Sequence, residues 1–154
     1  MYTLKMSGLL WACTWVHLVM GKAVVWTGDC LSIGDMFAPL CHSSDRHFGM
    51  NMLLLLPLVP YAEGKIVLSA YCCGALIQVA WWHCFFKHTA FGVFGVLGLS
   101  TVIYVLYGYY YYFSWLIVSQ LLLSLMLEIT VNDVGVSVYH ISGYISGILM
   151  TYLI

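Results

Sequence analysis

Long apolar segments, separated by short polar breaks, follow one another through almost the whole chain. Hydrophobic residues make up 63% of the 154 residues and charged residues only 7%, with a mean hydropathy of +0.96. A soluble domain has about 25% charged residues. We therefore expect an all-α integral membrane protein whose chain passes several times through the lipid bilayer.

The number of spans follows from the length of these segments. A span needs roughly 20 apolar residues, so the chain accommodates about six spans joined by short loops. No length remains for a soluble domain, and we expect residues 1–154 to form a single transmembrane domain. The first segment has no small-x-small cleavage site and is expected to be a retained span. The spans are expected at about 6–26, 47–61, 66–86, 89–107, 111–128 and 135–154.

Charge and cysteine content exclude some classes of partner and site. The net charge is −1 and no basic run is present, which argues against nucleic acid as a partner. The six cysteines include no C-x-x-C pair, and we expect neither a metal nor a cofactor. Cys30 and Cys41 share one predicted loop, where a disulfide and two free thiols are both open.

Polar residues cluster at the N-terminal end of the second apolar segment. His42, His47 and Asn51 precede or begin the run of leucines that ends at Pro57. His47 and Asn51 are four residues apart, which places both on one face of a helix. Polar groups near lipid need partners, so this face is expected to meet protein or a water-filled cavity.

Small residues mark two helices that are expected to pack together. In the last segment, Gly143 and Gly147 form a G-x-x-x-G pattern one turn after His140. Such a ridge of small residues lets another helix approach closely. The fourth segment offers a matching surface, because glycines recur in it at three-residue steps. They are Gly92, Gly95 and Gly98.

Together these patterns resemble the rhomboid family of intramembrane serine proteases. The family pattern at the sixth span, H-x-x-G-x-x-x-G, is matched from His140 onward, and Glu63-Gly64 matches the turn after the second span. The resemblance covers about residues 37–154 and implies a six-helix rhomboid-like bundle with short loops. The pattern at the second span, H-x-S-x-x-H-x-x-x-N-M, is matched by His42, Ser44, His47, Asn51 and Met52.

The resemblance also implies roles for particular residues. In the family, a serine in a G-x-S-G motif of the fourth span attacks the peptide bond, and a histidine of the sixth span is its base. A histidine and an asparagine of the second span bind the oxyanion. By this resemblance His140 takes the position of the base, and His47 and Asn51 take the oxyanion positions.

The nucleophile is expected to be missing. Phe94 and Gly98 fit the family's aromatic residue and downstream glycine, and this register places Ala90 at the serine position. Thr89 is one residue off and faces about 100° away on a helix. Ser100 lies nearly three turns further along, and we expect it to be too deep to meet His140.

Three functions remain open from the sequence. The first is a rhomboid-like protein without proteolytic activity, which binds transmembrane helices of client proteins and affects their trafficking or turnover. The second is an active rhomboid intramembrane endopeptidase in which Thr89 or another hydroxyl acts with His140. The third is a redox or carrier subunit that uses the histidines.

Overall fold

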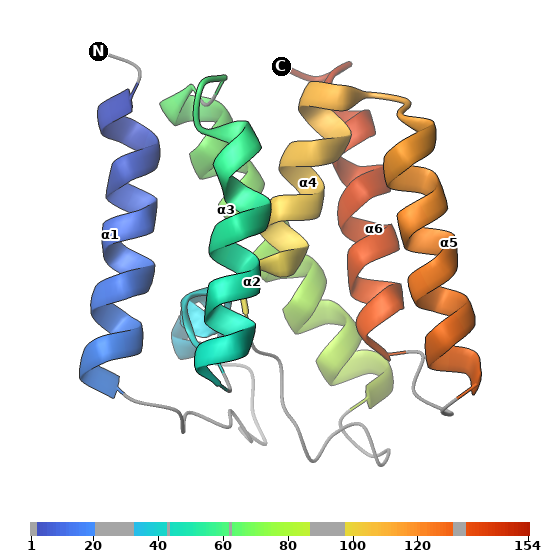
Figure 1. The fold of residues 1–154 in the computed structure, drawn as a ribbon, viewed down its shortest axis with the longest axis horizontal. Coiled ribbons are helices and arrows are strands. Elements are labelled where there is room, and N and C mark those ends of the chain that lie inside the picture. The colour runs from blue at the N-terminus through green and yellow to red at the C-terminus, as the bar shows by residue number, and fades with distance from the viewer. Residues whose placement is uncertain (1–2, 21–32, 43, 62, 87–97, 131–134) are drawn as a thin grey trace.

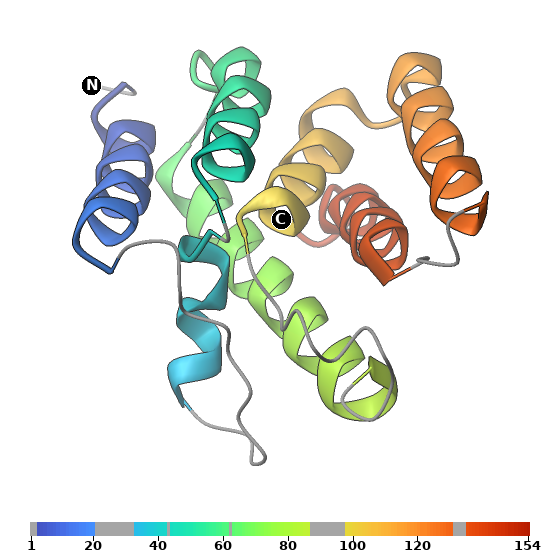
Figure 2. The ribbon, with the colours of Figure 1, turned by 60° about the horizontal axis from the view of Figure 1, so that its bottom comes forward.

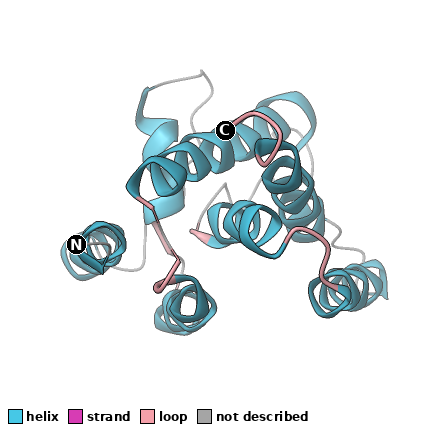
Figure 3. Cartoon of the chain, turned by 90° about the horizontal axis from the view of Figure 1, so that it is seen from above, coloured by secondary structure: helices cyan, strands magenta, loops and turns pink. Residues whose placement is uncertain are grey.

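The computed structural model describes residues 3–20, 33–42, 44–61, 63–86, 98–130 and 135–154. In these ranges the chain is all-helical, with no strand, as expected (Figures 1 and 3). Short 3-10 turns, η1 (Ile33–Leu40) and η2 (Leu56–Leu58), flank the second helix, and a π turn, η3 (Trp82–Phe86), ends the third. The helices are α1 (Thr3–Met20), α2 (Asp45–Leu55), α3 (Gly64–Trp81), α4 (Ser100–Tyr111), α5 (Trp115–Thr130) and α6 (Gly135–Met150).

The helix α4 is the centre of the bundle. Every residue from Thr101 to Gly108 is buried, and α4 packs most extensively on α6 and then on α3. The helices α1 and α5 stand at opposite edges (Figures 1 and 2). Figure 1 also shows that α4 begins about halfway along the bundle, whereas α3 and α6 extend further down. The start of α4 therefore lies inside the protein rather than at its end.

Glycines allow the close crossing of α4 and α6. A Cβ added at Gly147 would overlap the carbonyl oxygen of Val105 and press on Gly108. A Cβ added at Gly143 would lie 2.7 Å from the carbonyl oxygen of Thr101. Small residues at these positions bring the two backbones into contact, which is how a G-x-x-x-G ridge acts between helices.

The contribution of the fourth segment to this crossing differs from the expectation. Gly108 meets α6, whereas Gly98 lies against α2 and does not belong to the crossing. Gly92 and Gly95 lie outside the described residues.

The fourth helix also begins later than expected. Gly98 and Leu99 precede the helix, and Gly98 has a φ of +99°. An α-helix needs a φ near −63°, so the prediction of one helix over residues 89–107 is wrong where it runs through Gly98. The first described helical residue of this segment is Ser100.

One helix in the described part of the chain is long and apolar enough to cross a membrane. It comprises the 22 residues Gly64–Phe85, with shorter apolar helices at Gly8–Val19 and Trp115–Thr130. Six spans and a multi-pass topology stay predictions.

Candidate functional site

The second helix begins directly before His47. Ser44 is its N-cap, and the Ser44 Oγ accepts a hydrogen bond of 3.1 Å from the backbone N–H of His47. His47 and Asn51 consequently lie on one face of α2, one turn apart. Asn51 is buried, and its side-chain nitrogen has no hydrogen-bond partner among the described residues.

Gly98 lies directly against this face of α2. A Cβ added at Gly98 would be 2.6 Å from the Nε2 atom of His47 and 3.3 Å from the Nδ2 atom of Asn51. Only a residue without a side chain brings the main chain this close, and the positive φ of Gly98 also favours glycine. The segment before α4 is therefore held against two polar side chains.

Three hydrogen bonds fix the start of α4. The N–H of Gly98 donates to the carbonyl oxygen of Ala38 at 3.3 Å. The Nε2 atom of Gln78, a buried side chain of α3, donates to the Gly98 carbonyl oxygen at 2.8 Å and to the Thr101 Oγ1 at 3.0 Å. These bonds lie on both sides of the half-buried Ser100, so the position of its backbone is fixed by its neighbours.

His140 of α6 lies beside the first turns of α4. Its ring centroid is 4.4 Å from that of Tyr104, with 31° between the ring planes. Tyr104 follows Ser100 by one helical turn on the same face. Gly143, one turn after His140, packs on Thr101. Both ring nitrogens of His140 are buried and have no hydrogen-bond partner in the described ranges.

Four polar residues therefore lie around the start of α4, where Gly98 borders two of them and Tyr104 contacts a third. Two of these residues lie on α2, and His140 lies on α6. The arrangement contains a hydroxyl, an imidazole with unpartnered nitrogens, and an amide donor. The four residues are Ser100, His140, His47 and Asn51.

The placement of Ser100 differs from the sequence-based expectation. Ser100 is the first residue of α4, and Tyr104, one turn later, contacts His140. His140 contacts Tyr104, and no contact between Ser100 and His140 is seen among the described residues, so the expectation that Ser100 lies too deep to meet His140 stays a prediction. Ala90, the predicted position of the missing serine, and Thr89 lie outside the described residues.

A pattern in the sequence could have identified Ser100. Gly98-Leu99-Ser100 is a G-x-S motif, with an aromatic residue, Tyr104, four positions after the serine and Gly108 eight positions after it. These are the spacings that placed Phe94 and Gly98 after Ala90. Thr101 stands in place of the second glycine of the motif, which is the one departure.

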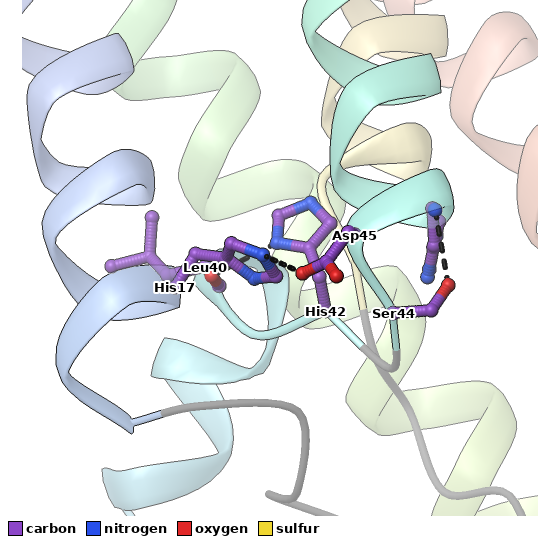
Figure 4. A network of polar contacts seen from close by, with 6 residues as sticks. His17, Leu40, His42, Ser44 and Asp45 are labelled. Carbon is purple, nitrogen blue, oxygen red and sulfur yellow. Dashed lines mark hydrogen bonds and ion pairs between the residues drawn. The ribbon is translucent and has the colours of Figure 1, made fainter.

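A cluster of aromatic rings joins α1 to the start of α2. His17 stacks on Phe48 with ring centroids 4.4 Å apart, and its Nε2 lies 3.0 Å from the Oδ1 of Asp45 (Figure 4). His42 stands edge-on to His17, Phe48 and His47 at 6.0, 5.3 and 5.2 Å. Burial and the neighbouring His47 lower the pKa of His42 to about 4. His42 is therefore neutral at neutral pH.

Among the described residues no three histidine, cysteine or acidic side chains are grouped so as to hold a metal ion. Comparisons of the chain with protein families, with curated proteins and with solved structures each gave no match. The site is therefore interpreted from its own geometry.

Proposed function

We propose that the chain is an intramembrane serine protease of the rhomboid type, with Ser100 as the nucleophile and His140 as its base. His47 and Asn51 bind the oxyanion. The observation that carries the proposal is the convergence at the start of α4, where Gly98 touches both His47 and Asn51 while Tyr104 contacts the His140 ring. This assignment replaces the inactive interpretation that rested on Ala90.

The chemistry follows that of a serine hydrolase. His140 accepts the hydroxyl proton of Ser100, and the Ser100 Oγ bonds to the carbonyl carbon of the substrate peptide. The negative charge on the carbonyl oxygen is stabilised by donors near the α2 face, among them the unpartnered amide of Asn51. The C–N bond then breaks, the proton passes from His140 to the leaving amine, and water hydrolyses the ester.

The surface of the bundle supports a membrane location. Large apolar side chains are exposed along α5, with Trp115 at 74%, Leu116 at 76% and Leu127 at 60%. Continuous exposed apolar surface is unusual on a soluble monomer and is typical of surface that faces lipid or another protein. Together with the 7% of charged residues, this supports a multi-pass protein with α5 against lipid.

A serine-reactive fluorophosphonate probe tests the proposal on protein purified in detergent. We expect labelling of the wild type, no labelling of Ser100→Ala, and labelling reduced by about 10³-fold or more in His140→Ala. Ser119→Ala is the matched control, because Ser119 is exposed on α5 and lies away from the site. Its labelling should equal that of the wild type.

Other outcomes favour the alternatives. Unlabelled wild-type protein that still binds a transmembrane client helix would support the inactive client-binding function. A histidine-using redox or carrier subunit would instead show visible absorbance or bound metal after purification. Labelling that survives Ser100→Ala would disprove the assignment of the nucleophile.

A further inference from the structure

A groove of about 650 Å³ lies between α1 and α2, on the side of α2 that is not used by the proposed active site. The groove is shallow and largely open at the surface of the two helices. It follows α2 from Arg46 to Leu56, which is about 15 Å of helix. All of its lining side chains except Thr14 and Arg46 are apolar, and the Thr14 hydroxyl is bonded within α1 to the carbonyl oxygen of Leu10.

Arg46, the charged residue that lines the groove, lies at one end of it. Arg46 is the second residue of α2 and is exposed. Its guanidinium forms no ion pair or hydrogen bond with any residue in the described ranges. Arginine at the edge of an apolar groove matches a ligand with an anionic oxygen group at one end and a hydrocarbon chain behind it.

The helices α1 and α2 are in contact at the end of the groove where Arg46 lies. His17 of α1 stacks on Phe48 and lies within hydrogen-bond distance of Asp45. A second helix, with a diameter of about 10 Å, would have to separate α1 from α2 and break both contacts. A single hydrocarbon chain fits without doing so. Gly49 leaves room for it, since nothing lies within 4 Å of the position of an added Cβ.

We propose that this groove binds a phospholipid with a net negative headgroup, whose phosphate pairs with Arg46 and whose acyl chain lies along α2 over Gly49. The proposal rests on the membrane location proposed above but not on the protease activity. It gives α1 a binding function, because α1 supplies Leu10 and Thr14 to the groove wall.

The experiment measures lipid that stays bound after extraction. The full chain is reconstituted into phosphatidylcholine vesicles containing a minor fraction of phosphatidylglycerol, extracted in detergent, and examined by native mass spectrometry. We expect the wild type to retain phosphatidylglycerol in preference to phosphatidylcholine. Arg46→Gln should lower that retention about fivefold, and Gly49→Leu should abolish it by filling the groove.

Two matched variants control for charge and for bulk. Lys65→Gln removes an exposed cation at the start of α3, and Gly8→Leu adds the same side chain to α1 at a glycine that also has open space around it. Both should retain phosphatidylglycerol as the wild type does. Leucine favours helix over glycine, so neither leucine variant should lose its fold.

The proposal is overturned if the wild type shows no preference for phosphatidylglycerol, or if Arg46→Gln and Lys65→Gln lose it equally. Loss in Gly49→Leu without loss in Arg46→Gln would also overturn it, because the headgroup would then not be recognised. Failure of the chain to enter vesicles contradicts the membrane location itself. Fluorophosphonate labelling, measured on the same samples, reports separately on the proposed protease activity.

Discussion

At Gly98 both the backbone conformation and the neighbouring side chains require glycine. The φ of +99° disfavours any residue with a Cβ, and that Cβ would lie 2.5 Å from the nearest atom of the His47 ring. The two requirements have different origins, one local and one tertiary, yet they fall on the same residue. This residue sets where α4 begins and how close Ser100 lies to the α2 face.

Gly98→Ala is therefore expected to reduce both stability and activity. Backbone strain of this kind destabilises by about 1–3 kcal/mol, and displacement of His47 should lower fluorophosphonate labelling as well. Thermal unfolding in detergent measures the first effect. Gly49→Ala serves as the control, because its Cβ meets open space within a helix and alanine there should stabilise by up to about 1 kcal/mol. Equal behaviour of the two variants would contradict this account of Gly98.

His42 makes stability depend on pH. Its pKa is lowered from the usual 6.5 to about 4 in the folded protein, so the unfolded chain binds a proton at a higher pH than the folded chain does. The stabilisation is complete above about pH 6.5 and is lost as the pH falls toward 4. The loss reaches at most about 3 kcal/mol.

Unfolding of the wild type and of His42→Phe, followed between neutral pH and pH 4, tests this dependence. The variant lacks the titrating group, so its stability should fall less steeply over that interval. Equal slopes in the two proteins would mean that His42 is not the group responsible. The nearby His17 and His47, which face His42 from α1 and α2, remain in both proteins.

Among the elements, the pair α4 and α6 holds the site together. The glycine contacts bring α6 close enough for His140 to reach Tyr104, one turn above Ser100. A residue larger than glycine in the crossing would push the helices apart and move His140 away from Tyr104. The glycines that allow α4 and α6 to pack closely therefore also set the distance between the parts of the site that these two helices carry.

Gly147→Ala should accordingly destabilise the protein by about 1–3 kcal/mol, the usual effect of overpacking, because the new methyl group would overlap the Val105 carbonyl oxygen. Gly8→Ala is the control in open space. Thermal unfolding of both variants in detergent checks the difference. If Gly147→Ala unfolds at the wild-type temperature, the two helices are not as close as described.

The sequence was sufficient to predict that the helices exist, but it was not sufficient to predict where α4 begins. Apolar runs between polar breaks predicted six helical segments, and the described residues contain six. The start of α4 depends on the contacts of Gly98 with Ala38, Gln78 and His47. These contacts are made by residues far away in the sequence. The hydropathy of the fourth segment therefore cannot predict them.

At the scale of the whole molecule, the site is assembled from three helices and the segment before α4. The spacing of His47 and Asn51 placed them on one face from the sequence alone, and the glycines after His140 indicated that α6 would meet the fourth segment. The proposed nucleophile, Ser100, was not selected from the sequence because the motif was aligned to the first apolar residues of that segment. The later G-x-S motif, at residues 98–100, agrees with the helix start.

The interior start of α4 has a consequence for the energy of the proposed reaction. The first backbone N–H groups of a helix have no partner within it and carry a partial positive charge. Among the residues that the structure describes, no side chain caps α4, so this positive end lies beside Ser100. In the proposed protease reaction, an oxyanion formed there would meet dipoles whose orientation the folded backbone already fixes.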